Sequence, residues 1–367
     1  MRKLAVIAAA VMVLVSCATV VPIGYMQPSA IDMGGYRNLA VASAVPYGGP
    51  VPGYRFVGYA DVHAAGLRIY SGYVSSTARR IADYATSELY STLSASGFYN
   101  LLPPDMTDAV LAAGSYGTDI SEEFSRMGYD AVLIPRISSM SLDESIYSIP
   151  RSKWWTDDDG IRHRCVVYDY GYVQTASIVY TLTVIDTSTG RIAAVRTFSD
   201  SMTRRDQLDP FWHRLDDPAY LFRRMISSFN GGILRLFVPL YREYEAALMA
   251  NKPENAASEA AYEAVRDGNM DTALSTFLSQ WEESGHVPSG YNAAVLTAAE
   301  GRFDDAIDLL SSVMEADESG DARELYRAMM AVRASDEQAE MQISGESSAA
   351  ADAAPDGNAV YDIVMRR

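Results

Sequence analysis

The chain has 367 residues, a formal net charge of −17 and an apolar fraction of 49%. This length corresponds to about two domains, and the apolar content supports a packed core, which argues against an intrinsically disordered protein. The negative charge argues against nucleic acid and anionic lipid headgroups as partners, because both require a basic surface on the protein.

The N-terminus, residues 1–16, has the features of a secretory signal peptide. Arg2 and Lys3 precede an apolar run of about a dozen residues, which is too short to span a bilayer as a permanent helix. The run ends in Leu-Val-Ser-Cys, which resembles the lipobox of bacterial lipoproteins. The resemblance implies that Cys17 receives fatty acyl chains such as palmitate and becomes the first residue of the mature protein. The alternative is an ordinary secreted protein with a cysteine by chance near its cleavage site.

The predicted location of the mature chain follows from this lipid anchor. Lipidation places the folded part outside the cytoplasm, in the cell envelope. Ala18 and Thr19 lack the aspartate that retains lipoproteins at the inner membrane of enteric bacteria, which favours the outer membrane, facing the periplasm. With Cys17 acylated, Cys165 is the remaining cysteine, so no intrachain disulfide is expected. We interpret Cys165 as a strand residue rather than a reactive site.

Residues 36–250 are expected to form an α/β domain. Proline and glycine within 17–35 indicate a tether that leads into it. The pattern then predicts a buried strand over 36–42 and a long loop over 46–73.

Helical and strand patterns alternate in the next part of this domain. Apolar residues recur at three- and four-residue steps over 75–96, which predicts an amphipathic helix. A short strand at 98–102, a helix at 118–127 and a buried strand at 129–134 follow. Two strand–helix–strand units in succession imply a mixed sheet with helices packed on it.

The remainder of the α/β domain begins with strand-like sequence. Residues 165–187 and 192–200 are predicted strands, joined by a hairpin turn at 186–191 in which Gly190 can adopt a positive φ. Two helices are expected to complete the domain, one near 217 and a longer one over 233–249 that Pro239 kinks or breaks.

An internal repeat marks the C-terminal third. Residues 267–274 match 300–307 at an offset of 33 residues, and each stretch is a glycine-containing turn between two predicted helices. A period near 33 or 34 residues with this pattern resembles tetratricopeptide repeats over 255–335; the alternative is a plain helical hairpin bundle. Residues 336–367, rich in Ser, Ala and acidic residues, are interpreted as a disordered tail. The predicted helices are 256–266, 271–283, 291–299 and 303–315.

No catalytic or metal-binding motif stands out in the sequence. The chain lacks a nucleophile elbow, a phosphate-binding loop and a dinucleotide-binding glycine motif, so no cofactor is expected and the chain is predicted not to be an enzyme. Asp157-Asp158-Asp159-Gly160 lacks the glutamate of an EF-hand loop, and a solvated acidic turn is the preferred interpretation. An envelope hydrolase assembled from distant residues is the less favoured alternative. The histidines lack the spacing of a helical zinc pair: His63, His163, His213 and His286.

Aromatic residues between 138 and 180 are the candidate partner-binding residues. Trp154 and Trp155 lie beside the acidic turn, where exposed rings suit a membrane interface or a partner pocket; packing beneath the loop is the alternative. Tyr168, Tyr170 and Tyr172 share one face of a continuous strand. That face indicates a binding platform, a transmembrane hairpin or an ordinary half-buried hairpin, and the incomplete alternation favours the last.

The order of these motifs resembles the periplasmic α/β domain of the CsgG and LpoB lipoproteins, also found at the N-terminus of TolB. The resemblance covers about 36–240, and it implies a domain that binds protein partners in the envelope. CsgG-like members form a secretion pore, and LpoB-like members activate peptidoglycan synthases. The added helical repeats and the weak alternation over 138–180 distinguish this chain from both. The stretches that carry the resemblance are 38–41, 81–89, 97–102, 128–134 and 182–192.

The leading hypothesis is therefore a lipid-anchored, non-catalytic adaptor or scaffold in the cell envelope. It combines an α/β domain with an all-α helical-repeat region, and its protein partners are unidentified. The alternative is a subunit of a CsgG-like outer-membrane export channel, with the tyrosine-rich hairpin in the membrane. The partner, the oligomeric state and the number of helical repeats stay open at this point.

Overall fold

The computed structural model describes residues 19–33, 35–48, 75–113, 119–208, 215–317 and 320–345. The predicted signal peptide, Cys17, most of the expected loop at 46–73 and the end of the expected tail lie outside the described residues. The chain divides into two compact units. Of the described residues, one unit holds 33–238 and the other holds 19–32 and 239–345.

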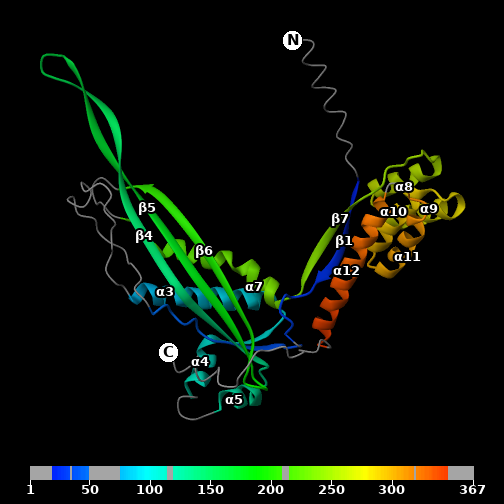
Figure 1. The fold of residues 1–367 in the computed structure, drawn as a ribbon, viewed down its shortest axis with the longest axis horizontal. Coiled ribbons are helices and arrows are strands. Elements are labelled where there is room, and N and C mark those ends of the chain that lie inside the picture. Colours follow the sequence, from blue (N-terminus) through cyan, green and yellow to red (C-terminus); the bar gives the residue numbers. More distant parts are fainter. Residues whose placement is uncertain are drawn as a thin grey trace. The chain divides into compact units, whose positions relative to one another are not determined.

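The first unit, which we call the α/β unit, is built on a five-stranded sheet (Figure 1). Its strand order is β3-β2-β4-β5-β6, with β2 parallel to β3 and β4 and the other neighbours antiparallel. The strands are β2 (Asn38–Val41), β3 (Asn100–Leu102), β4 (Ala131–Thr156), β5 (Arg162–Asp186) and β6 (Ile192–Gln207). The mixed sheet agrees with the predicted strand–helix–strand pattern.

Helices cover both faces of the parallel end of this sheet. Successive residues at the start of β4 and throughout most of β2 are buried, as expected where neither face of a sheet meets solvent. On one face, α4 and α5 contribute Leu111 and Phe124 to a core with Val132 and Ile134. The helices of the unit are α3 (Ser75–Ala95), α4 (Pro104–Ala113), α5 (Ile120–Arg126), α6 (Ala219–Ser228) and α7 (Asn230–Phe237).

The antiparallel end of the sheet is covered on one face. Even-numbered residues of β5 from Tyr172 to Val184 are buried, and the odd-numbered ones between them are partly exposed. α6 contacts β5 and β6 on the buried side. The exposed side carries hydroxyl groups that pair across strands, such as Ser141 with Ser177 and Thr175 with Thr203. This alternation is the pattern of a sheet with one solvated face.

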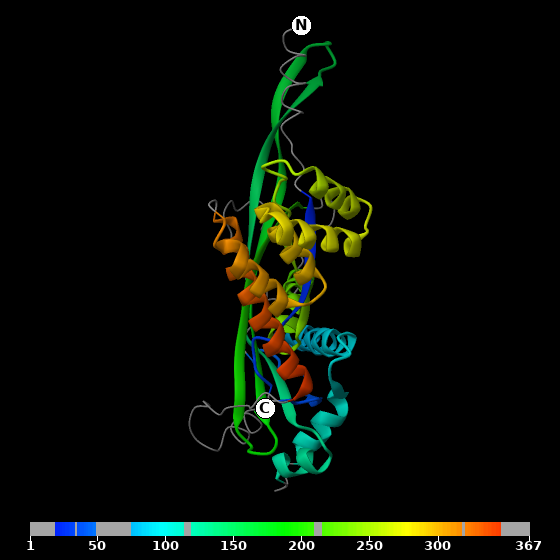
Figure 2. The same ribbon diagram turned by 90° about the vertical axis from the view of Figure 1, so that its right-hand side faces the viewer.

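The paired strands β4 and β5 extend beyond the rest of the sheet, as both views show (Figures 1 and 2). Toward the tip of the hairpin, pairing of β5 with β6 stops at Gly171. Pairing of β5 with β4 continues beyond it as far as Arg162 and Thr156. We call residues 148–170 the arm. At its tip, the Asp157 carboxylate accepts hydrogen bonds from the backbone N–H groups of Asp159 and Ile161. These bonds fix the predicted acidic turn.

The second unit, which we call the helical unit, combines a two-stranded ribbon with five described helices. β1 (Val20–Gln27) pairs antiparallel with β7 (Leu240–Ala247), and β1 contacts α10 and α12. Each helix from α8 to α11 packs on the next. The helices are α8 (Ala256–Arg266), α9 (Met270–Ser284), α10 (Val287–Ala299), α11 (Phe303–Met314) and α12 (Asp321–Ser344).

Small residues set the spacing of these helices. Gly268 and Gly301 have φ values of +78° and +79° in the two matching turns, a conformation that favours glycine. Ala273 and Ala306, one turn further on, are fully buried. The glycine turns of the internal repeat therefore lie between helices, as the sequence predicts.

Two sequence predictions differ from the structure. The expected tether, 17–35, contains strand β1, because Val21 and Ile23 alternate with exposed residues and enter the core of the helical unit. The expected helix at 233–249 ends at Phe237, and β7 replaces the rest, because Pro239 cannot continue a helix. Beyond residue 250 the described elements are all helices, and the two strands of the ribbon precede them in the sequence.

Two boundaries also differ. The sequence interpretation has no counterpart of α4, which begins at Pro104, a favourable residue for the first turn of a helix. The tail was expected to begin at 336, but α12 continues to Ser344. It is held by a hydrogen bond from the Ser29 backbone N–H to the Gln342 side chain, at 2.8 Å. Among the described residues, none of the helices combines the length and apolar character needed to cross a bilayer.

Candidate functional site

The arm carries the largest exposed aromatic side chains that the sequence singled out. Trp154, Trp155 and Tyr168 are 53%, 50% and 57% exposed. Ile161 and Val166, also on the arm, are exposed to a similar degree. Exposed apolar groups concentrated in one place mark interaction surfaces more often than scattered ones do. The arm is therefore the principal candidate site.

The tryptophan rings are held in place by cross-strand neighbours. Trp155 stacks on His163, with ring centroids 4.9 Å apart, and the Arg162 guanidinium lies 5.3 Å from the centroid of Trp154. Trp154 pairs with Arg164 and Trp155 with His163 across the hairpin, so the two rings are on opposite faces of the arm. Each face thus presents one exposed indole.

Charged groups accompany the aromatic residues along the arm. Arg151 forms an ion pair with Asp169 at 3.2 Å. The His163 ring hydrogen-bonds the Asp157 carboxylate at 2.5 Å. This hydrogen bond, followed by those from the backbone of the turn, lowers the pKa of Asp157. The arm therefore carries charged groups of both signs beside its exposed apolar residues, whereas the chain as a whole has a net charge of −17.

The three tyrosines that the sequence predicts on one face differ in how far they are buried. Tyr168 is exposed, Tyr170 is half-buried and Tyr172 is 2% exposed. Tyr172 packs with Ile146 and Leu215 in a small core at the base of the arm. Burial first, and then a hydrogen bond to Asp216, raises its pKa to about 12. Tyr172 anchors the arm to the sheet, and its burial corrects the expectation that it contacts a partner.

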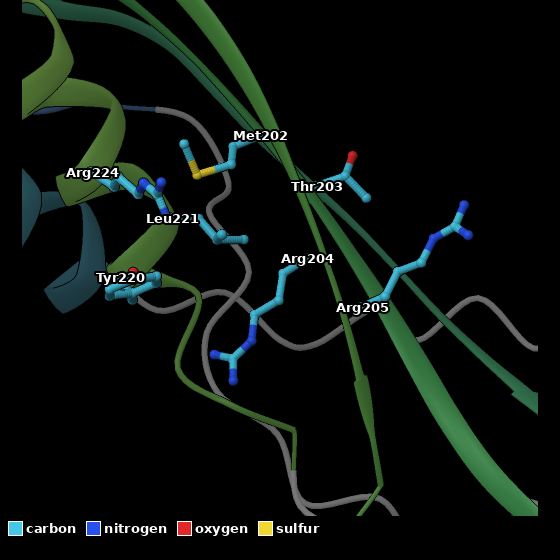
Figure 3. A pocket seen from close by; sticks show the side chains of 7 residues that line it. All are labelled: Met202, Thr203, Arg204, Arg205, Tyr220, Leu221 and Arg224. Carbon is cyan, nitrogen blue, oxygen red and sulfur yellow. The ribbon is translucent and has the colours of Figure 1, made fainter. Parts of the chain in front are cut away.

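A groove lies beside the outer edge of the sheet, between β6 and α6 (Figure 3). Its volume is about 760 Å³. Met202 and Arg204 point from β6 toward α6, whereas Thr203 and Arg205 point to the other side of the strand (Figure 3). The helix contributes Tyr220, Leu221 and Arg224.

The cations around this groove have different environments. Arg204 donates a hydrogen bond to Asp206 at 2.8 Å and forms an ion pair with Asp216. The bond to Asp206 is the main cause of the raised pKa of Arg204. Arg205 and Arg224 are exposed and have no ion pair within the described residues. As far as the described residues show, an arginine without an ion pair therefore lies on each side of the edge strand.

The sequence interpretation did not identify this groove. It ended the return strand at 200, so Arg204 and Arg205 were not placed on a strand. The predicted helix near 217 was in the right place, but nothing in its sequence indicated that it would overhang the edge of the sheet. The tertiary pairing of β5 with β6 creates the site.

The described histidines have structural partners. His163 is part of the arm, and His286 is buried at the start of α10. The His286 ring bonds the Ser289 hydroxyl at 2.7 Å and the Pro253 carbonyl at 2.9 Å. His63, His213 and Cys17 lie outside the described residues. Within the described part of the chain, no cluster of three or more His, Cys, Asp or Glu residues has a metal-binding arrangement.

Comparison with known proteins gives no family assignment. No protein-family model and no curated protein sequence matches the chain. Similar solved structures include PelC dodecamers from Paraburkholderia phytofirmans in two crystal forms. They show 14% identity over 59% and 60% of this chain and over 97% and 99% of PelC, with TM-scores of 0.25 and 0.24. Lipoprotein GNA1162 from Neisseria meningitidis shows 10% identity over 54% of this chain and 97% of its own, with a TM-score of 0.24. Similarity at these scores does not support a functional argument.

Proposed function

We propose that this chain is a lipid-anchored envelope protein that acts as a non-catalytic adaptor or scaffold for other proteins. The arm is the observation that carries the proposal. Trp154, Trp155 and Tyr168 are each at least half exposed there. Tryptophan, tyrosine and arginine are the residue types that dominate binding energy at protein interfaces.

The construction of the arm suits a binding element. Its side chains are on a continuous, hydrogen-bonded hairpin rather than on a loop, and Tyr172 fixes its base. A rigid hairpin loses little conformational entropy when a partner binds. Its ion pairs and hydrogen bonds place polar groups around the indoles, as in the rim of a protein interface.

The helical unit supports the same proposal. Its paired helices and the glycine turns at 268 and 301 are consistent with tetratricopeptide-like repeats. Such helical repeats present surfaces for peptide or helix partners. The lipid predicted at Cys17 would hold both units at a membrane, so that partners meet at one place in the envelope.

The competing candidate is a subunit of a CsgG-like outer-membrane export channel. The arm has about nine residues on each strand, close to the length of a transmembrane β-strand. However, charged groups are present on both faces: Arg162 and Arg164 on one, and Lys153 and Asp169 on the other. A lipid-facing strand surface requires an uninterrupted apolar band. The arrangement therefore favours a partner protein over a bilayer.

A substitution at the arm tests the adaptor proposal. We expect that exchange of Trp154 and Trp155 for alanine abolishes in-cell crosslinks between the arm and envelope proteins, since these rings form the centre of the surface. The matched control is Met106→Ala, which removes an exposed apolar side chain from α4. Crosslink patterns identified by mass spectrometry provide the measurement. An unchanged set of crosslinked proteins in the tryptophan variant contradicts the proposal.

A second measurement separates the adaptor from the channel. After Cys17→Ser removes the lipid, an adaptor is released from membranes by carbonate or urea and is monodisperse in solution. A chain that resists extraction without its lipid indicates that the arm is inserted in the bilayer. That outcome supports the channel and overturns the adaptor.

A further inference from the structure

The outer edge of the sheet is formed by a long strand that pairs on one side. β6 has 16 residues, and within the described parts of the chain its partner is β5 alone. Natural proteins usually protect such an edge with proline, lysine, a bulge or a short strand. From Ile192 to Gln207 the sequence contains no proline and no lysine, and the register shift in the pairing of β5 with β6 lies at the start of β6, between Ile192 and Ala194. The edge is thus open to pairing with another extended segment.

The hydrogen-bond pattern shows which backbone groups face outward. The Leu208 N–H donates to the Tyr170 carbonyl, at 2.9 Å, and continues the register of β5 with β6. Because antiparallel ladders alternate, the backbone groups of the odd-numbered residues of β6 then point away from β5. The N–H groups of Ser199, Thr203 and Arg205 therefore lie at the open edge, with no partner among the described residues.

Carboxylates already occupy two other positions along this edge. The Ser201 N–H donates to the Asp200 side chain at 2.7 Å, and the Gln207 N–H donates to the Asp206 side chain at 2.8 Å. These two outward N–H groups are therefore satisfied within the chain. Among the described residues from Ser199 to Gln207, the N–H groups of Ser199, Thr203 and Arg205 are the ones that remain for an added strand.

The groove between β6 and α6 provides contacts for the side chains of an added strand. Side chains of an added strand would alternate between the two faces of the sheet, so that every second one would lie under the overhang of α6. There it would meet the apolar atoms of Met202 and the exposed ring of Tyr220 (Figure 3). Strand addition commonly obtains affinity from the main chain and specificity from such alternate pockets.

The charges beside the edge define the partner further. Arg224 on the groove side and Arg205 on the opposite side lack ion pairs within the described residues, although the chain carries a net charge of −17. Arg204 is already neutralised by Asp206 and Asp216. A strand with carboxylate side chains on both of its faces complements this arrangement.

We propose that the open edge of β6 is a β-augmentation site for an extended acidic segment of a partner protein. Carboxylates of the segment lie near Arg224 and Arg205, and one apolar side chain packs on Met202 and the ring of Tyr220. The inference rests on the proposed adaptor function and names the chemistry by which one partner is held.

The test uses the full chain with Cys17→Ser and a fluorescein-labelled peptide, Ser-Val-Glu-Glu-Ile-Glu-Val-Thr. We expect the peptide to bind with a rise in anisotropy and to slow amide exchange between Ser199 and Arg205. Thr203→Pro removes one outward N–H and should weaken binding by about tenfold or more, whereas Thr203→Ala keeps that N–H and retains binding. Proline is tolerated where the N–H of an edge strand faces solvent.

A charge-reversal pair tests the groove independently of the strand. Arg224→Glu should weaken peptide binding, while Arg235→Glu on α7, away from the groove, should not. A peptide with lysine in place of each glutamate should fail to bind.

Several outcomes overturn the proposal. These are absence of peptide binding, equal binding by Thr203→Pro and Thr203→Ala, or indifference to Arg224→Glu. Self-association of the chain that Thr203→Pro abolishes would assign the edge to a second copy instead. The adaptor function stands apart from this result: if arm crosslinks persist in Thr203→Pro while peptide binding never occurs, the edge proposal alone fails.

Discussion

Single polar groups in the core of the α/β unit differ in whether they find a partner. The Tyr180 hydroxyl is buried among apolar residues and has no hydrogen-bond partner within the described structure. The Tyr99 hydroxyl, also buried, donates to the Phe237 carbonyl. Burial raises the pKa of both phenols. Of the two hydroxyls, that of Tyr99 has a protein acceptor that replaces the hydrogen bonds to water lost on folding.

This contrast predicts opposite effects for the same substitution. Tyr180→Phe should leave the free energy of unfolding unchanged or raise it by up to about 1 kcal/mol, because it removes an unsatisfied buried hydroxyl. Tyr99→Phe should lower it by about 1 kcal/mol, because it leaves a carbonyl without its donor. Urea denaturation of both variants measures the difference. A larger loss for Tyr180→Phe than for Tyr99→Phe contradicts this account.

The pKa of Tyr172 predicts a response to alkaline pH. Burial, and then the hydrogen bond to Asp216, raise it to about 12 from an ordinary value of 10.0. The folded state therefore holds this proton more tightly than the unfolded state does. The stabilising contribution is complete below about pH 10 and is lost as the pH rises toward 12. In urea unfolding from about pH 8 to about pH 11, Tyr172→Phe should show a shallower loss of stability than the parent; parallel curves would exclude this role.

The elements follow from the sequence where one local signal dominates. The apolar spacing of 75–96 predicted α3 within one residue. The predicted bounds of α8, α9 and α11 are also within one residue of the structure, whereas α10 begins at Val287 instead of 291. The strands of the hairpin were predicted as strands, but their lengths were not. The extension of β6 to Gln207 depends on pairing with β5 rather than on its own polar, arginine-rich sequence.

Other elements depend on partners distant in the sequence. β1 and β7 pair with each other, although β1 precedes the α/β unit in the sequence and β7 follows it. The local pattern therefore predicted neither strand. The arm aromatics were identified correctly as unusual, yet burial of Tyr172 depends on Leu208 and Leu215 arriving from beyond the sheet. The groove is likewise produced by tertiary packing, which a single sequence does not display.

Helix packing in the helical unit gives a sharp prediction at this scale. A Cβ atom at Gly290 of α10 would lie 2.6 Å from Val313 and 2.8 Å from Trp281. Gly290→Ala should therefore lower the stability of the helical unit by about 1–3 kcal/mol, through overpacking.

The matched control is Gly231→Ala on α7, where a Cβ would meet no atom within 4 Å. That variant should be neutral or stabilising by up to about 1 kcal/mol, because alanine is the better helix former. Thermal unfolding followed by circular dichroism measures both variants. Equal stability of the parent and Gly290→Ala would show that the helices are not in close contact there.

At the scale of the molecule, the helical unit is discontinuous in the sequence: one of its segments precedes the α/β unit and the other follows it. The chain begins with β1 in the helical unit, passes through the α/β unit and returns at Pro239. The expected boundaries at 36 and 250 therefore place the ribbon in the wrong unit. The reason is physical: Val21, Ile23 and Ala246 bury their side chains with those of α10 and its neighbours.

This organisation predicts that the N-terminal strand supports the C-terminal helices. A chain that starts at residue 33 loses the ladder of β7 and the bond from the Met26 N–H to Asp336, at 2.7 Å. Amide exchange should quicken in α10 and α12 and stay unchanged in β4 and β5. Ile23→Ala, at a fully buried position, should reproduce a milder form, with a loss of about 2–5 kcal/mol. Unchanged exchange in α12 after the deletion would contradict this dependence.

The central claim is that the arm binds protein in the cell envelope. The most direct measurement places a photoreactive amino acid at Trp155 and, as a control, at Met106, in living cells that express the full chain. The account predicts discrete protein adducts from Trp155 that are absent from Met106, with mass spectrometry identifying the crosslinked protein. Adducts to lipid alone, or the same adducts from both positions, would contradict it.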